Sequence, residues 1–103
     1  MKVIGLGRPG CAIASKFTNY PEYTVYCVDA QNDDYSGKYI EVEEQQTHED
    51  YEDNYKPINL NTPEGPILFI FSGSGKISGI SLRLLENFKN NDIDILYIKP
   101  DLS

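Results

Sequence analysis

The sequence has no tryptophan and contains only one methionine, one histidine and two cysteines in 103 residues. Two cysteines are too few for a disulfide framework, and Cys11 and Cys27 lack the spacing of a metal site. No apolar run approaches the roughly 18 residues that a membrane span needs. The N-terminus lacks the basic flank, long apolar stretch and cleavage site of a signal peptide. We therefore expect a cytoplasmic protein without a membrane partner.

Charge is distributed unevenly along the chain. The net charge of -7 argues against nucleic acid as a partner. Residues 29–55 contain ten acidic residues and one basic residue, whereas the rest of the chain contains eight basic and six acidic residues. An anionic ligand is therefore electrostatically allowed outside the acidic segment.

Four apolar segments predict the strands of a parallel sheet. Residues 2–6 and 67–71 are apolar without alternation, which is typical of strands buried on both faces. Residues 23–28 and 93–98 complete the set, and we expect the last strand to be buried as well. With helices between the strands, the order predicts one α/β domain over residues 1–103. Its expected architecture is a three-layer Rossmann-like sheet of about four main strands with helices on both faces.

The helix expected after the third strand has a broad apolar face. Ile77, Ile80, Leu84 and Phe88 follow one another at intervals of three or four residues, the spacing of neighbours on one helix face. Leu82 and Leu85 are expected to widen that buried face.

A glycine turn, Gly5-Leu6-Gly7-Arg8-Pro9-Gly10, lies between the first strand and the first helix. Its spacing matches the dinucleotide-binding pattern, and Asp29 follows Gly10 by 19 residues, where a ribose-binding acid lies in such proteins. The glycines let the backbone approach a pyrophosphate at the helix N-terminus. They equally fit a turn that only lets a helix pack against a strand. Cys11 is either a small packing residue, which we favour, or a thiol activated by the helix dipole.

A second glycine turn follows the third predicted strand. It is not a P-loop, because the required earlier glycine is missing and Ile77 follows Lys76 in place of serine or threonine. If the third strand lies on the far side of the first strand from the second, the two turns meet and a phosphate chain fits between them. The turn supplies these candidate ligands: Gly73, Ser74, Gly75, Lys76, Ser78 and Gly79.

Residues 32–66 form an acidic segment with scattered tyrosines and little sustained periodicity. Residues 39–42 predict a short strand, and Thr47 followed by Asp50 predicts a helix start. We favour a solvated excursion that tyrosines attach to the domain over a surface for binding a partner. His48 lies among acidic residues, but no second histidine is available and adjacent carboxylates on a helix diverge, so we expect no metal site.

Four segments resemble the tubulin/FtsZ family. Residues 7–17, GRPGCAIASKF, are similar to the first phosphate loop and helix of tubulins, GQCGNQIGAKF, and to its counterpart in FtsZ. Residues 28–31, VDAQ, resemble the TDAQ segment of FtsZ, and residues 98–100, IKP, resemble the TKP that ends a later strand. Residues 73–79, GSGKISG, resemble the tubulin signature GGGTGSG. The matches occur in the family's order and cover about a quarter of the chain.

The resemblance implies binding of GTP or GDP by Gly7, Arg8, Gly10 and Cys11 together with the second glycine turn. Ser74, Lys76 and Ile77 depart from the tubulin signature, and Pro9 and Cys11 depart from the family's first phosphate loop. The family's base-contacting loops and catalytic acidic loop would lie downstream of this chain, so we expect no catalytic residue and no hydrolysis by the chain alone. Two alternatives stay open. One is a Rossmann NAD-type module with Asp29 on the ribose, and the other is an assembly protein that self-associates through residues 32–66 without binding nucleotide.

Overall fold

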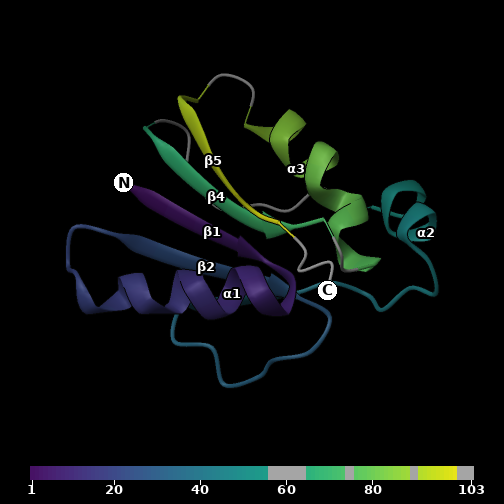
Figure 1. The fold of residues 1–103 in the computed structure, drawn as a ribbon, viewed down its shortest axis with the longest axis horizontal. Helices are drawn as coiled ribbons and strands as arrows, with labels where there is room; N and C mark the ends of the chain where they lie inside the picture. Colours follow the sequence, from purple (N-terminus) through teal and green to yellow (C-terminus); the bar gives the residue numbers. More distant parts are fainter. Residues whose placement is uncertain (56–64, 74–75, 89–90, 100–103) are drawn as a thin grey trace.

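The computed structural model describes residues 1–55, 65–73, 76–88 and 91–99. Its centre is a parallel five-stranded sheet with the order β3-β2-β1-β4-β5 (Figure 1). The strands are β1 (Lys2–Leu6), β2 (Thr24–Asp29), β3 (Lys38–Glu41), β4 (Ile67–Ser72) and β5 (Ile93–Ile98). The predicted Rossmann-like α/β fold is confirmed, and β3 is the short strand expected over residues 39–42, displaced by one residue.

Helices cover both faces of the sheet. On one face, α1 (Gly7–Lys16) packs across β1, β2 and β4 and is followed by a short 3₁₀ helix, η1 (Phe17–Asn19). The other face is covered by α2 (His48–Asp53), a 3₁₀ helix η2 (Lys76–Ile80) and α3 (Ser81–Asn87) (Figure 1). This gives the three layers expected from the sequence. No helix in the described ranges has the length and apolar character that a membrane span requires.

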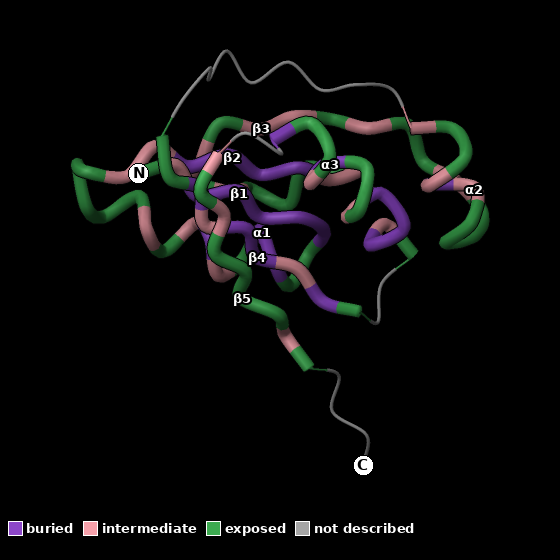
Figure 2. The backbone as a smooth tube through the Cα atoms, turned by 90° about the horizontal axis from the view of Figure 1, so that it is seen from above, coloured by how far each residue is buried: buried purple, intermediate pink, exposed green. Residues whose placement is uncertain are grey.

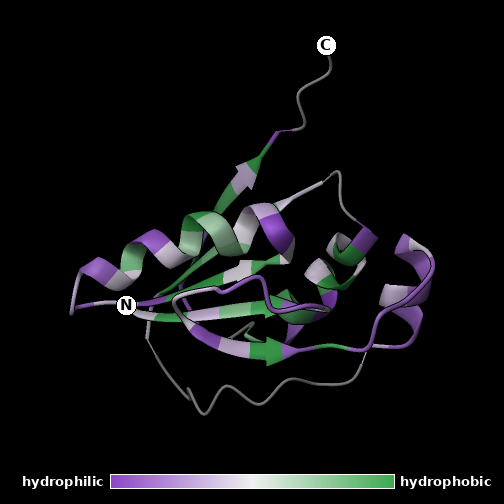
Figure 3. Ribbon diagram, turned by 90° about the horizontal axis from the view of Figure 1, so that it is seen from below, coloured by the Kyte–Doolittle hydropathy of each residue, from purple (hydrophilic) through white to green (hydrophobic). Residues whose placement is uncertain are grey.

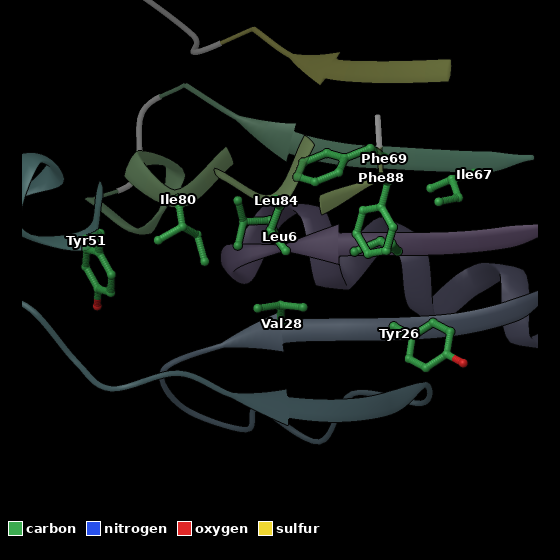
Figure 4. Packing of buried hydrophobic residues seen from close by; sticks show 10 residues of the cluster. Leu6, Tyr26, Val28, Tyr51, Ile67, Phe69, Ile80, Leu84 and Phe88 are labelled. Carbon is green, nitrogen blue, oxygen red and sulfur yellow. The ribbon is translucent and has the colours of Figure 1, made fainter. Parts of the chain in front are cut away.

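Buried side chains from β1 enter two separate apolar clusters, one on each face of the sheet. Val3 packs in the cluster beneath α1, whereas Ile4 and Leu6 belong to the larger cluster on the α3 face (Figure 4). Figure 2 shows that β1, β2 and β4 are the buried centre of the molecule. Because both faces of β1 are covered, its apolar residues need no polar alternation, and the prediction of a central strand was correct.

The segment after the second glycine turn is divided between η2 and α3. Ile80, Leu84 and Phe88 are buried at 2%, 0% and 6% exposure, as predicted. Leu82 is 63% exposed, so its expected place in the buried face was wrong. Leu82 lies two positions from both Ile80 and Leu84, and residues two apart in a helix point to different sides.

The prediction that residues 93–98 form a buried strand was wrong. β5 lies at the edge of the sheet, and Ile95, Leu96 and Tyr97 are 52%, 43% and 51% exposed. The reason is the position of α1, which lies over β1, β2 and β4. The strand that leads to the C-terminus therefore carries hydrophobic residues on an exposed edge (Figures 2 and 3).

The acidic segment is attached to the domain more firmly than a solvated loop. The predicted helix start is confirmed, since the Thr47 hydroxyl accepts a hydrogen bond from the backbone NH of Asp50 at 3.1 Å. The helix itself, α2, is hydrophilic along most of its length (Figure 3, right). Tyr51 is its buried residue, with 6% exposure, and packs in the cluster on the α3 face (Figure 4). Part of the acidic segment, residues 56–64, lies outside the described residues.

Candidate functional site

The carboxyl ends of β1, β2 and β4 lie next to one another at one end of the sheet, because these three strands are adjacent and parallel. β4 lies on the far side of β1 from β2, which is the condition under which the two glycine turns meet. The strand order therefore reverses between β1 and β4. Ligands of open α/β sheets bind at such a reversal, outside the carboxyl ends of the strands.

The two glycine turns touch at this end of the sheet. Gly7 begins α1 and has a φ of +74°, a conformation that favours glycine. A Cβ at this position would lie 2.7 Å from Cγ2 of Ile77, in η2. The turns thus meet as the phosphate hypothesis requires, but the side chain of Ile77 fills the space beside Gly7.

The other two glycines of the first turn are explained by packing. A Cβ at Gly5 would lie 2.6 Å from the carbonyl oxygen of Gly10 and 2.8 Å from the Cβ of Ala14. A Cβ at Gly10 would collide with the carbonyl oxygen of Ile70 in β4. α1 can approach the sheet this closely only because both positions lack a side chain. The packing alternative therefore accounts for Gly5 and Gly10.

The second glycine turn is also constrained by its neighbours. A Cβ at Gly79 would collide with the carbonyl oxygen of His48 in α2, and a Cβ at Gly73 would collide with the hydroxyl group of Tyr97. Ser78 is only 4% exposed. Ser78 and Gly79 therefore lie in the interior of the protein, where η2 packs against α2. Two of the predicted ligands lie outside the described residues: Ser74 and Gly75.

A cavity of about 510 Å³ opens at the carboxyl ends of the strands. Its volume falls in the range of small-molecule sites. Three predicted site residues border it: Arg8 from the first turn, Asp29 from the end of β2 and Lys76 from the start of η2. The lining does not include the other predicted residues that the structure describes: Gly7, Gly10, Cys11, Gly73, Ser78 and Gly79.

Asp29 is held in place by hydrogen bonds to both of its carboxylate oxygens. The backbone NH of Ala30 donates to Oδ1 at 2.8 Å, and the hydroxyl of Tyr35 donates to Oδ2 at 2.7 Å. The Tyr39 hydroxyl donates to the backbone carbonyl of Asp29 at 3.0 Å. Burial and the hydrogen bond to Asp29 raise the pKa of Tyr35, which keeps its phenol a neutral donor. A carboxylate oxygen accepts a hydrogen bond from any hydroxyl group, so a ligand hydroxyl can take the place of the Tyr35 hydroxyl on Oδ2 of Asp29.

Both signs of charge border the cavity. Nε of Arg8 lies 3.3 Å from Oδ2 of Asp33, in an ion pair whose side chains are 81% and 59% exposed. Lys76 forms no ion pair with any residue in the described part of the chain. Asp29 and Glu44 supply the other carboxylates of the lining. Arg8 and Lys76 can therefore attract phosphate, while the carboxylates can accept hydrogen bonds from hydroxyl or amino groups.

Both cysteines lie in the core beneath α1, and each is 0% exposed. The Cys11 thiol lies 3.4 Å from the carbonyl oxygen of Gly5 and 3.5 Å from that of Val28. A hydrogen bond with Cys27 and burial raise the pKa of Cys11 well above its ordinary value. The complete burial of both thiols opposes a reactive cysteine, and both residues fit the packing interpretation.

Among the described residues, no group of three or more His, Cys, Asp or Glu side chains is placed to hold a metal ion. The backbone carbonyl of His48 instead faces Gly79 at the contact between α2 and η2. His48 thus contributes its main chain to packing.

Sequence reasoning missed several cavity residues. The acidic composition of residues 29–55 gave no reason to single out Asp33 or Glu44, and the tyrosines were assigned only to attachment. One signal was present, because Tyr35 follows closely after Asp29 in a loop at the carboxyl end of β2. Residues in such loops are those that border a ligand in this type of fold.

Comparisons with known proteins identify no relative of this chain. No family model matches the sequence, and comparisons with curated proteins and with solved structures find no match either.

Proposed function

We propose that this protein binds a nucleotide in the cavity at the carboxyl ends of β1, β2 and β4, and that the ligand is GTP or GDP. One observation carries the proposal: Arg8 and Lys76, from the two glycine turns, border the same cavity as Asp29. The two cations would hold phosphates, and the Asp29 carboxylate would accept a hydrogen bond from the ribose. The two turns are among the four segments that resemble tubulins and FtsZ, and this resemblance supports a guanine nucleotide.

A Rossmann NAD-type module is the second candidate. It is favoured by the position of the cavity, which all five residues from 29 to 33 border at the end of β2. In such modules an acidic residue at this place binds the ribose, and a single glycine turn holds the pyrophosphate. The two candidates therefore differ in whether Lys76, in the second turn, contributes to binding.

Thermal unfolding with added ligand tests the proposal. GTP, GDP, NAD and guanosine are compared at about 0.15 M salt, so that weak ionic attraction is screened. A ligand present at 100 times its Kd stabilises the folded state by about 2.7 kcal/mol, which raises the Tm of a domain of this size by roughly 10 °C or more. We expect GTP and GDP to raise the Tm more than NAD or guanosine.

Variants of the cavity residues identify the site. Arg8→Ala and Lys76→Ala should each weaken GTP binding by about tenfold, because a charged hydrogen bond is lost in each. Arg83→Ala is the matched control, since Arg83 pairs with Glu86 on α3 at 4.0 Å and does not border the cavity. NAD binding that depends on Asp29 but not on Lys76 would favour the second candidate. No stabilisation by any of the four ligands would overturn nucleotide binding.

A further inference from the structure

Two of the three groups that a nucleotide would use, Asp29 and Arg8, already contact side chains of one short turn. The phenol of Tyr35 donates to Oδ2 of Asp29 at 2.7 Å, as a ribose hydroxyl would. The carboxylate of Asp33 lies 3.3 Å from Nε of Arg8, as a phosphate oxygen would. We propose that residues 32–35 form an autoinhibitory strap, an internal mimic of the ligand that a nucleotide displaces when it binds. This inference rests on the proposed function of the cavity.

The turn is built to present both groups at once. Oδ1 of Asn32 accepts a hydrogen bond from the backbone NH of Tyr35 at 3.2 Å, which closes the turn on itself. Asp34 has a φ of +55°, a left-handed conformation that aspartate tolerates better than most residues. Its two neighbours, Asp33 and Tyr35, both border the cavity. The strap is therefore a compact unit whose two contacts are made by residues on either side of one left-handed position.

The two contacts of the strap differ in strength, and both are weak enough for a nucleotide to displace the strap. The Arg8–Asp33 pair is largely exposed, and pairs of this kind contribute little to stability. The bond from the Tyr35 phenol to the Asp29 carboxylate involves a charged acceptor and is the stronger of the two. A site that is open for only a fraction of the time has its apparent affinity reduced by that fraction. Removing either contact should therefore tighten nucleotide binding.

Tyr35→Phe tests the phenol contact. We expect it to tighten GTP binding by about tenfold, because the hydroxyl that competes for Asp29 is gone while the ring remains. Tyr39→Phe is the matched control, since the Tyr39 hydroxyl bonds the backbone carbonyl of the same Asp29 and does not border the cavity. This control should bind GTP with the wild-type affinity.

Asp33→Asn tests the ion pair. We expect it to tighten GTP binding by about threefold. Removing any negative charge near the cavity favours an anionic ligand, so Glu44→Gln serves as the control for this general effect. Glu44 borders the same cavity, and no ion pair joins it to a described residue. The effect of Asp33→Asn should exceed that of Glu44→Gln.

A second measurement separates displacement from a purely structural role. In the wild type, saturating GTP should move the ring NMR signals of Tyr35 toward those of a solvent-exposed tyrosine, because the displaced strap no longer holds the phenol against Asp29. A structural contact that persists in the complex would leave these ring signals unchanged, and this result would overturn the strap. Wild-type binding with no gain in Tyr35→Phe or Asp33→Asn would also overturn it, while leaving the proposed function intact. Binding of GTP to a variant that carries both Tyr35→Phe and Asp33→Asn, but not to the wild type, would support a closed strap. No binding to this double variant or to the wild type would overturn both proposals.

Discussion

Ile77 covers Gly7: its Cγ2 lies 2.7 Å from the position that a Cβ of residue 7 would take. This contact joins the turn after β1 to the turn after β4, although about 70 residues separate them in the chain. It holds the two turns at one end of the sheet, on either side of the point where the strand order reverses. Arg8 and Lys76, the neighbours of this pair in sequence, consequently border one cavity.

Gly7→Ala should lower the free energy of unfolding by about 2 to 3 kcal/mol, because the left-handed backbone and the contact with Ile77 both oppose a side chain. Gly65→Ala is the control, since Gly65 has a φ of +112° and no heavy atom of a described residue lies within 4 Å of its added Cβ. Urea unfolding measures both. In an Ile77→Ala background the excess cost of Gly7→Ala over Gly65→Ala should disappear. An equal cost for the two glycines in the wild type would contradict the contact.

Tyr51→Ala should lower the free energy of unfolding by about 3 to 4 kcal/mol, because Tyr51 is 6% exposed in the cluster that includes Ile80 and Leu84. The measurement tests whether the acidic segment is part of the cooperative fold. Tyr20→Ala, at a position 55% exposed, is the control and should cost less than about 1 kcal/mol. Similar costs for the two variants would mean that α2 is not part of the unit that unfolds.

The protein should lose stability as the pH rises above about 10. Burial and the carboxylates of Glu41 and Asp29 raise the pKa of Tyr39 to about 12, and that of Tyr35 is raised by burial and its bond to Asp29. A raised folded-state pKa stabilises the protein fully below the unfolded value, near 10, and this stabilisation is lost as the pH rises through the folded value. Urea unfolding at several alkaline pH values should show a shallower decline for Tyr35→Phe than for the wild type. An unchanged decline would contradict the hydrogen bond between the Tyr35 phenol and Asp29.

The central sheet could be predicted from the sequence because β1 and β4 are apolar without alternation, a pattern typical of strands covered on both faces. β5 has the same pattern but lies at the edge, and nothing in its own residues indicates where the helices of the opposite layers end. The expected burial of Leu82 was wrong for a similar reason. A broad apolar helix face is buried only where the neighbouring elements cover its full width. Whether a strand lies at the edge or in the centre of the sheet is decided by tertiary packing.

The candidate site was predictable in part. Arg8, Asp29 and Lys76 were named from glycine turns and from a position at the end of a strand, which are local features. Gly10 was predicted to bind phosphate. Its close approach to the backbone of Ile70 instead gives it a packing role, which depends on the position of β4. A bulky substitution at Gly10 would therefore destabilise the fold whether or not nucleotide binds. Tyr35 was missed because its contact depends on the shape of one irregular turn.

A titration of the isotope-labelled protein with GTP, followed by amide NMR, tests the central claim most directly. If the two glycine turns and the end of β2 form one nucleotide site, the amides of Gly7, Arg8, Ala30 and Lys76 will shift together along a single binding curve. The Arg83 amide, on α3, will not follow that curve. Shifts confined to only one of the two turns, or no shifts at either turn in saturating GTP, would contradict the claim.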